Sequence, residues 1–502
     1  MTSRMLSKLI SRTIMVAALC IAGSIGTSGC RRSEPEAQKA QDAKQEATPT
    51  VSATPNIVFI LVDTLRADRL GAYGRTPSIT PALDAIAKEG MTFGRTVAPA
   101  PWTLPSVASI FTSYNPSVHK VTSRDVGSGA TADTVVNPLR EEFHTLAESL
   151  KLLGYSTGGF VANPYLLGRF GFAQGYDEYD TSMTVREDLG SGAAVNEAAL
   201  TWLRGRERDK PFFLYLHYMD THGPYRSGPA YLDDLLVEVE KQPNKTALTA
   251  EELEELGVLD TIPAACTDKE RHRRLRAFRE YWAARYEAGV RELDHHVATL
   301  RGSLEEMGVW DEAYVILTSD HGEALCEHGL WNHGYSVHHT DLHVPLVLRW
   351  PGKIRAGAEA SRLVRLIDLM PTVLSQLTLP LPPDIQGVSL IPLIEGGELE
   401  EPLAAFSEGV KNGPKQRAMQ IRNWKLITTL KTARQQLFDL ENDYDEQVDL
   451  SAKYPARVAS LQGLMREELK SSVQLARQGP SKPVPVPPEQ LERLRQLGYV
   501  GD

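Results

Sequence analysis

The sequence is poor in cysteine, has no excess of basic residues and contains no long apolar run. Four cysteines in 502 residues are too few for a fold built on disulfides. A formal net charge of -10 argues against non-specific nucleic-acid binding, which needs a basic surface, although a local field can still attract an anionic substrate. At roughly 100–200 residues per domain, the length allows a large core and a smaller second unit.

The first thirty residues are typical of an export signal rather than of a folded domain. A basic segment precedes the apolar stretch TIMVAALCIAGSIG, which is shorter than the about 20 residues that span a bilayer comfortably. A buried amphipathic helix is the alternative, but polar periodicity is missing. TSGC resembles a bacterial lipobox, with Thr27 where leucine is usual. We therefore expect residues 1–30 to be an export signal and Cys30 to carry a lipid.

Residues 31–54 are polar and almost free of large apolar side chains, so we expect a disordered tether. Arg31, rather than aspartate, follows the cysteine, which favours the outer membrane over retention at the inner one. The expected location is the periplasm or the outer membrane, with contact to the membrane through the lipid anchor only. Whether Cys266 and Cys326 pair stays open.

Short β-branched runs alternate with helical stretches after the tether. NIVFILVDT, GGFVA, PFFLYLHY, AYVILTSD and VPLVLRW predict buried strands, and LDAIAKEG, HTLAESLKLLG and AALTWLRG predict helices. This alternation predicts an α/β sheet with helices on both faces. Ligands of such sheets bind beyond the carboxyl ends of the strands, where Asp63, Asp220 and Asp320 stand.

The pattern divides the chain after the tether into three parts. Residues 55–400 are predicted to form the catalytic domain, with a charged helical insertion at about 229–283. Residues 401–478 combine short strand patterns with the helix ARVASLQGLMREEL and predict a small C-terminal subdomain. Residues 479–502 form a proline-rich tail with one amphipathic turn.

Aspartate and histidine recur together at the predicted strand ends. In SDHGE, Asp320 and His321 are adjacent, and Gly322 permits the bend that would let both face one ion. Carboxylate oxygens with an imidazole suit a divalent metal. Two further motifs add side chains of the same kinds: Asp220 and His222 from YMDTHGPY, and His333 from WNHGY.

The segment PWTLPSVASIFTS predicts a loop that turns into a helix at Thr103. Threonine there can cap the helix by accepting a hydrogen bond from its first-turn amides. It can also be a nucleophile, because a helix N-terminus is suited to hold an anionic substrate. The residues around it leave both roles open and compatible.

Four segments, taken in order, resemble the successive motifs of the sulfatase family of the alkaline phosphatase superfamily: NIVFILVDTLRADRLGAYG, TLPSVASIFTSYNPSVHKV, FFLYLHYMDTHGPY and VILTSDHGEALCEHGLWNHG. The similarity continues through HVPLVLRWPG, FDLENDYDEQVDLS and LERLRQLGYV. It implies an alkaline-phosphatase-like sandwich, in which a large mixed sheet lies between helices, with a small C-terminal α+β subdomain.

The resemblance also implies roles for the candidate residues. Thr103 matches the nucleophile, and His222 and His333 match positions that contact substrate oxygens or protonate the leaving group. One divalent cation is implied, Ca²⁺ by the habit of sulfatases and Mn²⁺ or Zn²⁺ by that of relatives with a threonine nucleophile. Its ligands would be Asp63, Asp320, His321 and Thr103.

The chain departs from the family pattern in ways that bear on its substrate. Sulfatases have a cysteine or serine at the nucleophile position, which is oxidised to formylglycine, whereas Thr103 cannot become an aldehyde and Val107 replaces the arginine of that motif. Thr64 stands where many sulfatases have a second ligating aspartate. The family's Gly-Lys-x-x-His segment is replaced by GGFVANPY, so two cationic contacts are missing, and we expect Asn163 and Asp220 to contact substrate instead.

Taken together, these features predict an exported, metal-dependent hydrolase of sulfate or phosphate esters in which Thr103 attacks in line and no formylglycine forms. The expected partner is a small-molecule, glycan or lipid ester, not a nucleic acid. One alternative is a transferase that passes a phosphoryl group to a lipid or sugar hydroxyl. The other is a non-catalytic, ligand-binding lipoprotein.

Overall fold

The computed structural model describes residues 54–126, 133–185, 192–225, 227–228, 230–232, 235, 269–476, 481–497 and 499. The predicted export signal, nearly all of the tether, Cys30, Cys266 and most of the predicted insertion lie outside these residues. Cys326 is a free cysteine. Within the described part of the chain, no helix is both long and apolar enough to cross a membrane.

A large mixed sheet forms the centre of the catalytic domain. Its strands follow the order β11-β2-β12-β8-β1-β7-β5-β6, and β13 pairs with β2. The bounds are β1 Ile57–Val62, β2 Met91–Val97, β5 Ser156–Val161, β6 Glu178–Asp180, β7 Phe212–Tyr218, β8 Tyr314–Ser319, β11 His343–Val344, β12 Leu346–Arg349 and β13 Ala358–Arg365. The five predicted strand runs all lie in this sheet. Strand β1 is buried along its whole length, as its uninterrupted apolar run requires.

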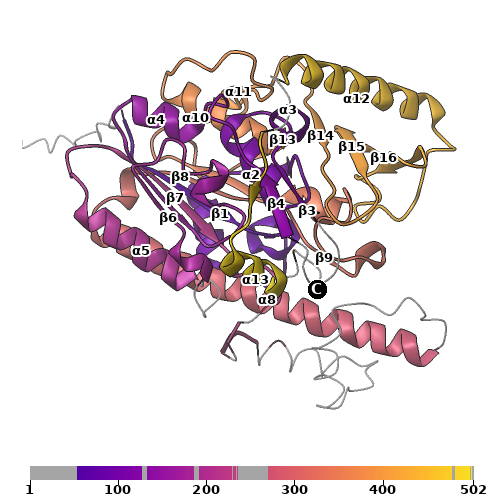
Figure 1. The fold of residues 1–502 in the computed structure, drawn as a ribbon, viewed down its shortest axis with the longest axis horizontal. Coiled ribbons are helices and arrows are strands. Elements are labelled where there is room, and N and C mark those ends of the chain that lie inside the picture. The colour runs from indigo at the N-terminus through magenta and orange to yellow at the C-terminus, as the bar shows by residue number, and fades with distance from the viewer. Residues whose placement is uncertain are drawn as a thin grey trace, which may run out of the picture. The chain divides into compact units, whose positions relative to one another are not determined.

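Helices cover both faces of the sheet, as predicted (Figure 1). Phe59 and Tyr215 point to one face, where they pack on Phe111 of α2. Phe160 and Phe212 point to the other, where they pack on Trp202 of α5. The helices of the first layer are α2 Thr103–Thr112, α4 Leu146–Leu152 and α10 Leu369–Gln376; those of the second are α1 Pro81–Glu89, α5 Gly192–Gly205 and α8 Lys269–Glu306. Shorter elements are α3 Pro116–His119, α9 His339–Leu342 and α11 Ile391–Ile394, with the hairpin strands β9 Ala324–Leu325 and β10 Trp331–Asn332.

Helix α8 is longer than the sequence pattern indicated. The predicted insertion ends near residue 283, but the helix continues to Glu306. Leu293, Val297 and Leu300 are fully buried in its second half. Because these apolar residues recur at helical spacing, they belong to the layer that covers the sheet.

A second, antiparallel sheet forms the C-terminal subdomain. It contains β14 Ala404–Ser407, β15 Gln416–Ile421, β16 Trp424–Thr429 and β17 Arg434–Asp439 in sequence order, and α12 Pro455–Leu475 packs on it. A small separate core joins the two, with Leu426, Leu437 and Leu461 at its centre.

The tail after the subdomain returns to the catalytic domain. Strand β18 Val484–Pro485 pairs with β4 Asp133–Asn137, which in turn pairs with β3 Thr122–Val126. Helix α13 Pro488–Gln496 follows, with Leu491 and Leu494 buried. The tail is therefore part of the packed structure, and its last described residue, Tyr499, is buried as well.

The register of the central strands brings three chain segments to one edge of the sheet. Val62 at the end of β1 lies opposite Tyr218 of β7 and Ser319 of β8. The backbone N–H of Asp63 donates to Tyr218 O at 2.9 Å, which continues the ladder by one residue. Asp63 and Asp320 therefore leave the sheet side by side, at the carboxyl edge where α/β sheets bind ligands.

Candidate active site

Thr103 is the first residue of α2, and its hydroxyl contacts side chains from other parts of the chain. The preceding Trp102 is the N-cap residue, and no side chain caps this helix. The Thr103 Oγ lies 3.3 Å from Asp63 Oδ2 and 3.3 Å from His321 Nε2. The hydroxyl is therefore surrounded by acid and imidazole groups at the positive end of a fully buried helix. It does not cap the helix.

Four buried side chains converge beside the Thr103 hydroxyl. His321 Nε2 lies 3.3 Å from Asp63 Oδ1 and 3.5 Å from Asp320 Oδ2. His217, which sequence reasoning missed, points from β7 toward Asp63 with Nε2 3.8 Å from Oδ2. Ligand atoms of Asp63, His217 and Asp320 all lie within 4.8 Å of one another. The structure therefore brings together the four predicted ligands and adds a second histidine.

The charges of this cluster fit a bound cation. Asp320 Oδ2 is buried and accepts no hydrogen bond from the described residues. Burial, and then the neighbouring Asp63 carboxylate, raise the pKa of Asp320 well above its usual value. Burial also opposes ionisation of Asp63, but the surrounding histidines, His321 first, outweigh it and lower its pKa. Two facing carboxylates with an open oxygen and imidazoles are a donor set that a divalent cation can satisfy.

His222 and His333 lie on the other side of the nucleophile position. Their ring centroids are 4.9 Å apart, and the His333 ring lies 4.5 Å from that of His321. Burial lowers the pKa of His222 to about 4 and the pKa of His333 well below its usual value, which favours the neutral form of both imidazoles. His222 Nε2 is buried and has no hydrogen-bond partner among the described residues.

Glu323, which sequence reasoning also missed, orients His333. Its Oε1 lies 3.1 Å from His333 Nδ1. Burial raises the pKa of this carboxyl to about 7. A carboxyl group at one ring nitrogen fixes the orientation of the imidazole and leaves the other nitrogen for chemistry.

Asn163 reaches the cluster from the segment that follows β5. Its Nδ2 donates to Asp63 Oδ2 at 2.6 Å and lies 3.4 Å from Thr103 Oγ. Its Oδ1 accepts a hydrogen bond from the N–H of Tyr165, which holds the amide in this orientation. The structure therefore places Asn163 next to the nucleophile position, where an oxygen of a bound ester would lie.

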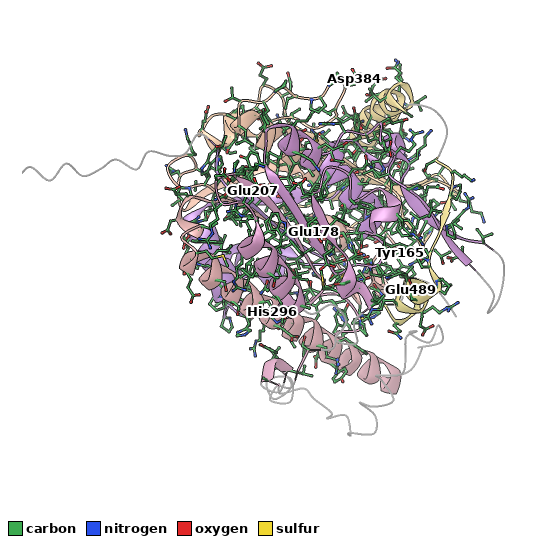
Figure 2. The ribbon with its side chains drawn as sticks, turned by 60° about the vertical axis from the view of Figure 1, so that its left-hand side comes forward. Tyr165, Glu178, Glu207, His296, Asp384 and Glu489 are labelled. Carbon is green, nitrogen blue, oxygen red and sulfur yellow. The ribbon has the colours of Figure 1, made fainter. Side chains whose placement is uncertain are left out.

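Asp220 does not join this cluster, and a contact of its carboxylate with substrate stays a prediction. The chain turns directly after β7, and the His222 N–H bonds to Met219 O within the turn. The Asp220 carboxylate is thereby directed toward α5 and α8, where its Oδ1 accepts from Gly192 N at 3.2 Å and pairs with His296 Nδ1 at 2.8 Å. Figure 2 labels His296 on the long helix α8.

Thr64 stands where many sulfatases have a ligating aspartate, but it has no carboxylate and its hydroxyl bonds elsewhere. It has a positive φ of 62°, and its hydroxyl donates to Thr221 O at 2.8 Å. The side chain thus ties two strand-end loops together instead of facing the cation position.

Lys411 brings a positive charge that the sequence pattern did not reveal. It comes from the loop after β14, and its Nζ donates to Tyr165 OH at 2.8 Å and to the backbone oxygen of Tyr499. Burial lowers the pKa of this amine to about 7. The subdomain therefore supplies a cation near the position where the family's lysine is missing.

Only two of the residues that sequence reasoning missed, His217 and Glu323, lie in a recognisable pattern. His217 is a lone histidine in an otherwise apolar strand, and Glu323 completes the SDHGE motif; both could have been found there. Lys411 stands in ordinary surroundings far along the chain, and Tyr499 lies in LERLRQLGYV, a segment that resembles the family but indicates no role at the site. Only the return of the subdomain loop and the tail to the catalytic domain places them at the site.

A second group of potential metal ligands combines a buried ion-pair network around Glu446 with His328, which is not buried. His328, His338 and Glu446 have ligand atoms within 4.8 Å of one another. Both oxygens of Glu446 are engaged, however, one by Lys425 Nζ at 2.7 Å and the other by His338 Nδ1 at 2.7 Å. This group links the subdomain to the catalytic domain.

Family models match most of the chain. The model described as "Sulfatase" matches residues 55–379, and that described as "N-sulphoglucosamine sulphohydrolase, C-terminal" matches residues 326–474. The chain belongs to the sulfatase family of the alkaline phosphatase superfamily and is an ester hydrolase of that family.

Curated relatives agree with this assignment. Arylsulfatase K of Gallus gallus is 25% identical over 468 residues, which cover 83% of each chain. The multifunctional alkaline phosphatase superfamily protein PehA of Trinickia caryophylli is 26% identical and covers 68% of this chain and 77% of its own length.

Solved structures share the fold. One, a protein in complex with its substrate D-glucosamine-2-N,6-O-disulfate, has a TM-score of 0.68 at 20% identity and covers 84% of this chain and 98% of its own. Another, the phosphonate monoester hydrolase of Agrobacterium radiobacter, has a TM-score of 0.62 at 21% identity and covers 84% and 96%. The predicted sandwich with its large mixed sheet and C-terminal subdomain is confirmed.

Proposed function

We propose that this protein hydrolyses a sulfate or phosphate ester with Thr103, unmodified, as the nucleophile, and with a divalent cation held by Asp63, Asp320, His321 and the Thr103 oxygen. The observation that carries the proposal is the position of Thr103 Oγ, 3.3 Å from both Asp63 and His321 at the start of a buried helix. A cation there would favour the alkoxide form of threonine, as it favours deprotonation of bound water. His217 is a further candidate ligand.

The chain's own residues account for both steps of the reaction, the formation of a threonine ester and its hydrolysis. Thr103 Oγ attacks the phosphorus or sulfur atom in line, and the helix N-terminus and the Asn163 amide stabilise the charge on the remaining oxygens. His222 or His333 gives a proton to the departing oxygen. Binding of an anionic ester raises the proton affinity of these neutral imidazoles, because it places negative charge beside them. Water then hydrolyses the threonine ester.

The charge of the site favours a monoanionic substrate. Relatives and structural neighbours include sulfatases and a phosphonate monoester hydrolase, so the family accommodates both kinds of ester. Formylglycine can expel sulfate from a hydrated aldehyde, but a threonine ester must be hydrolysed directly. The two cationic contacts of the family segment are missing, and Lys411, whose pKa burial lowers to about 7, replaces them only in part. We therefore propose a phosphodiester or phosphonate ester as the preferred substrate.

A panel of aryl esters tests this preference. We expect kcat/KM to be higher for an aryl phosphodiester or phosphonate ester than for the aryl sulfate with the same leaving group. The shared leaving group isolates the effect of the transferred group. The mass of the peptide that contains Thr103 should be that of unmodified threonine. An aryl sulfate as the best substrate would contradict the preference, and a mass change at Thr103 would contradict the unmodified nucleophile.

We also propose that the protein is exported and anchored by a lipid at Cys30, on the basis of TSGC and the polar segment that follows. Replacing Cys30 by alanine should move the full-length protein from the membrane to the soluble fraction, because one acyl-modified cysteine is the expected membrane contact. Fractionation followed by immunoblotting measures this. The matched control is Cys20→Ala, in the predicted signal, which should leave the partition unchanged. A Cys30→Ala variant that stays with the membrane would rule out the anchor.

A further inference from the structure

The tail places one tyrosine directly on the proposed nucleophile. Tyr499 OH lies 2.9 Å from Thr103 Oγ and accepts a hydrogen bond from Asn163 Nδ2 at 3.0 Å. Thr103 and Asn163 precede Tyr499 by 396 and 336 residues in the chain. Tyr499 belongs to LERLRQLGYV, one of the segments that resemble the sulfatase family, but the sequence gives no sign of this contact.

The ring of Tyr499 fills the space between the candidate acid–base histidines and the subdomain. Its centroid lies 4.9 Å from that of His222 and 5.5 Å from that of His333. On the other side it packs edge-on against Tyr165 at 4.9 Å, with the amine of Lys411 5.1 Å from its centroid. Figure 2 labels Tyr165 near Glu489 of α13, the helix that leads to Tyr499. The tyrosine is thus held by several groups in one position.

With Tyr499 in this position, the reacting groups are shut off from solvent. Thr103 and Asn163 are fully buried, and His222, His333 and Tyr499 are each 4% exposed. An ester can reach Thr103 Oγ only if one of the groups around it moves. Asp63 and His321 belong to the cation side of the hydroxyl, and Asn163 is fixed by its bond to the Tyr165 backbone. The contact of Tyr499 with Thr103 is a hydrogen bond between two hydroxyls, which an oxygen of an incoming ester can replace.

We propose that the Tyr499 hydroxyl occupies the place that one non-bridging oxygen of the transferred sulfate or phosphate group takes. Tyr499 then competes with substrate, and its displacement controls access to the site. The proposal rests on the function proposed above. The Tyr499 oxygen lies within hydrogen-bond distance of both Thr103 Oγ and the Asn163 amide. An oxygen of a bound oxyanion would accept the Asn163 hydrogen bond at the same place. An incoming oxyanion therefore displaces the hydroxyl and takes over the Asn163 bond.

Binding of inorganic sulfate tests this without requiring turnover. The full-length protein, supplied with Ca²⁺, is titrated with sulfate by isothermal calorimetry, and Tyr499→Phe and Tyr499→Ala are compared with the wild type. Each variant should bind sulfate about tenfold more tightly, the factor that corresponds to one competing hydrogen bond. Tyr499→Phe keeps the ring and its packing, so it remains informative if the alanine variant folds poorly.

The matched control is Tyr155→Phe, because the Tyr155 hydroxyl bonds to Pro55 O and its ring is equally buried. This control should bind sulfate as the wild type does. Unchanged or weaker binding by folded Tyr499→Phe would overturn the proposal, since the hydroxyl would then assist the anion or be irrelevant to it. The result does not depend on whether Thr103 is the nucleophile, because binding of the anion involves no covalent step.

Discussion

Replacing Thr103 by alanine is expected to lower kcat/KM by at least about a hundredfold on the best ester of the panel. The hydroxyl is the group that would form the covalent ester, and Asp63, His321 and Asn163 all surround it. Removing it should leave the fold in place, because Thr103 does not cap α2. Steady-state kinetics, with thermal unfolding as a check of folding, measure the effect.

Two variants control this experiment. Thr103→Ser keeps a hydroxyl at the same position and should retain far more activity than the alanine variant. Thr112→Ala removes a buried hydroxyl at the other end of α2, where it bonds to Ala108 O, and should leave the kinetics unchanged. If Thr103→Ala kept the wild-type rate, the hydroxyl would not be the nucleophile, whatever the metal content of the protein.

Replacing Asp320 by alanine is expected to abolish the binding of a divalent cation. Purified wild-type protein should contain about one ion per chain by elemental analysis, and the variant should contain almost none. Asp320 Oδ2 is buried without a hydrogen-bond partner beside Asp63, so the variant loses an oxygen that the described residues leave open for a cation. Because a ligand that binds only the folded state stabilises it, a chelator should lower the Tm of the wild type and leave that of the variant unchanged.

Asp220→Asn is the matched control for the metal experiment. Asp220 is the third strand-end aspartate of the sequence, but its carboxylate pairs with His296, away from the cluster. This variant should keep its ion and its response to chelator. A wild-type protein that is active without any divalent ion, or an Asp320→Ala variant with full metal content, would contradict the proposed site.

Much of the site could be predicted because its residues follow strands that the sequence itself defines. The apolar runs of β1, β7 and β8 are unbroken, and parallel strands in register end at one edge of the sheet. Asp63 and Asp320 follow two of these runs directly, so their proximity follows from strand order alone. The same reasoning failed for Asp220, because it lies one residue further on, in a turn that directs its side chain to the opposite layer.

Sequence by itself determined the fold class and the edge of the sheet at which Asp63 and Asp320 lie, because periodic burial and strand ends are local properties of the chain. The roles of the site residues stay predictions. The tertiary structure alone decided that Thr103 turns its hydroxyl toward acids and imidazoles, that the Lys411 amine contacts Tyr499 and that Tyr499 covers the Thr103 hydroxyl. These contacts join the start of α2 to the subdomain loop and to the tail. They depend on how distant segments pack on one another, and no local pattern of residues encodes such packing.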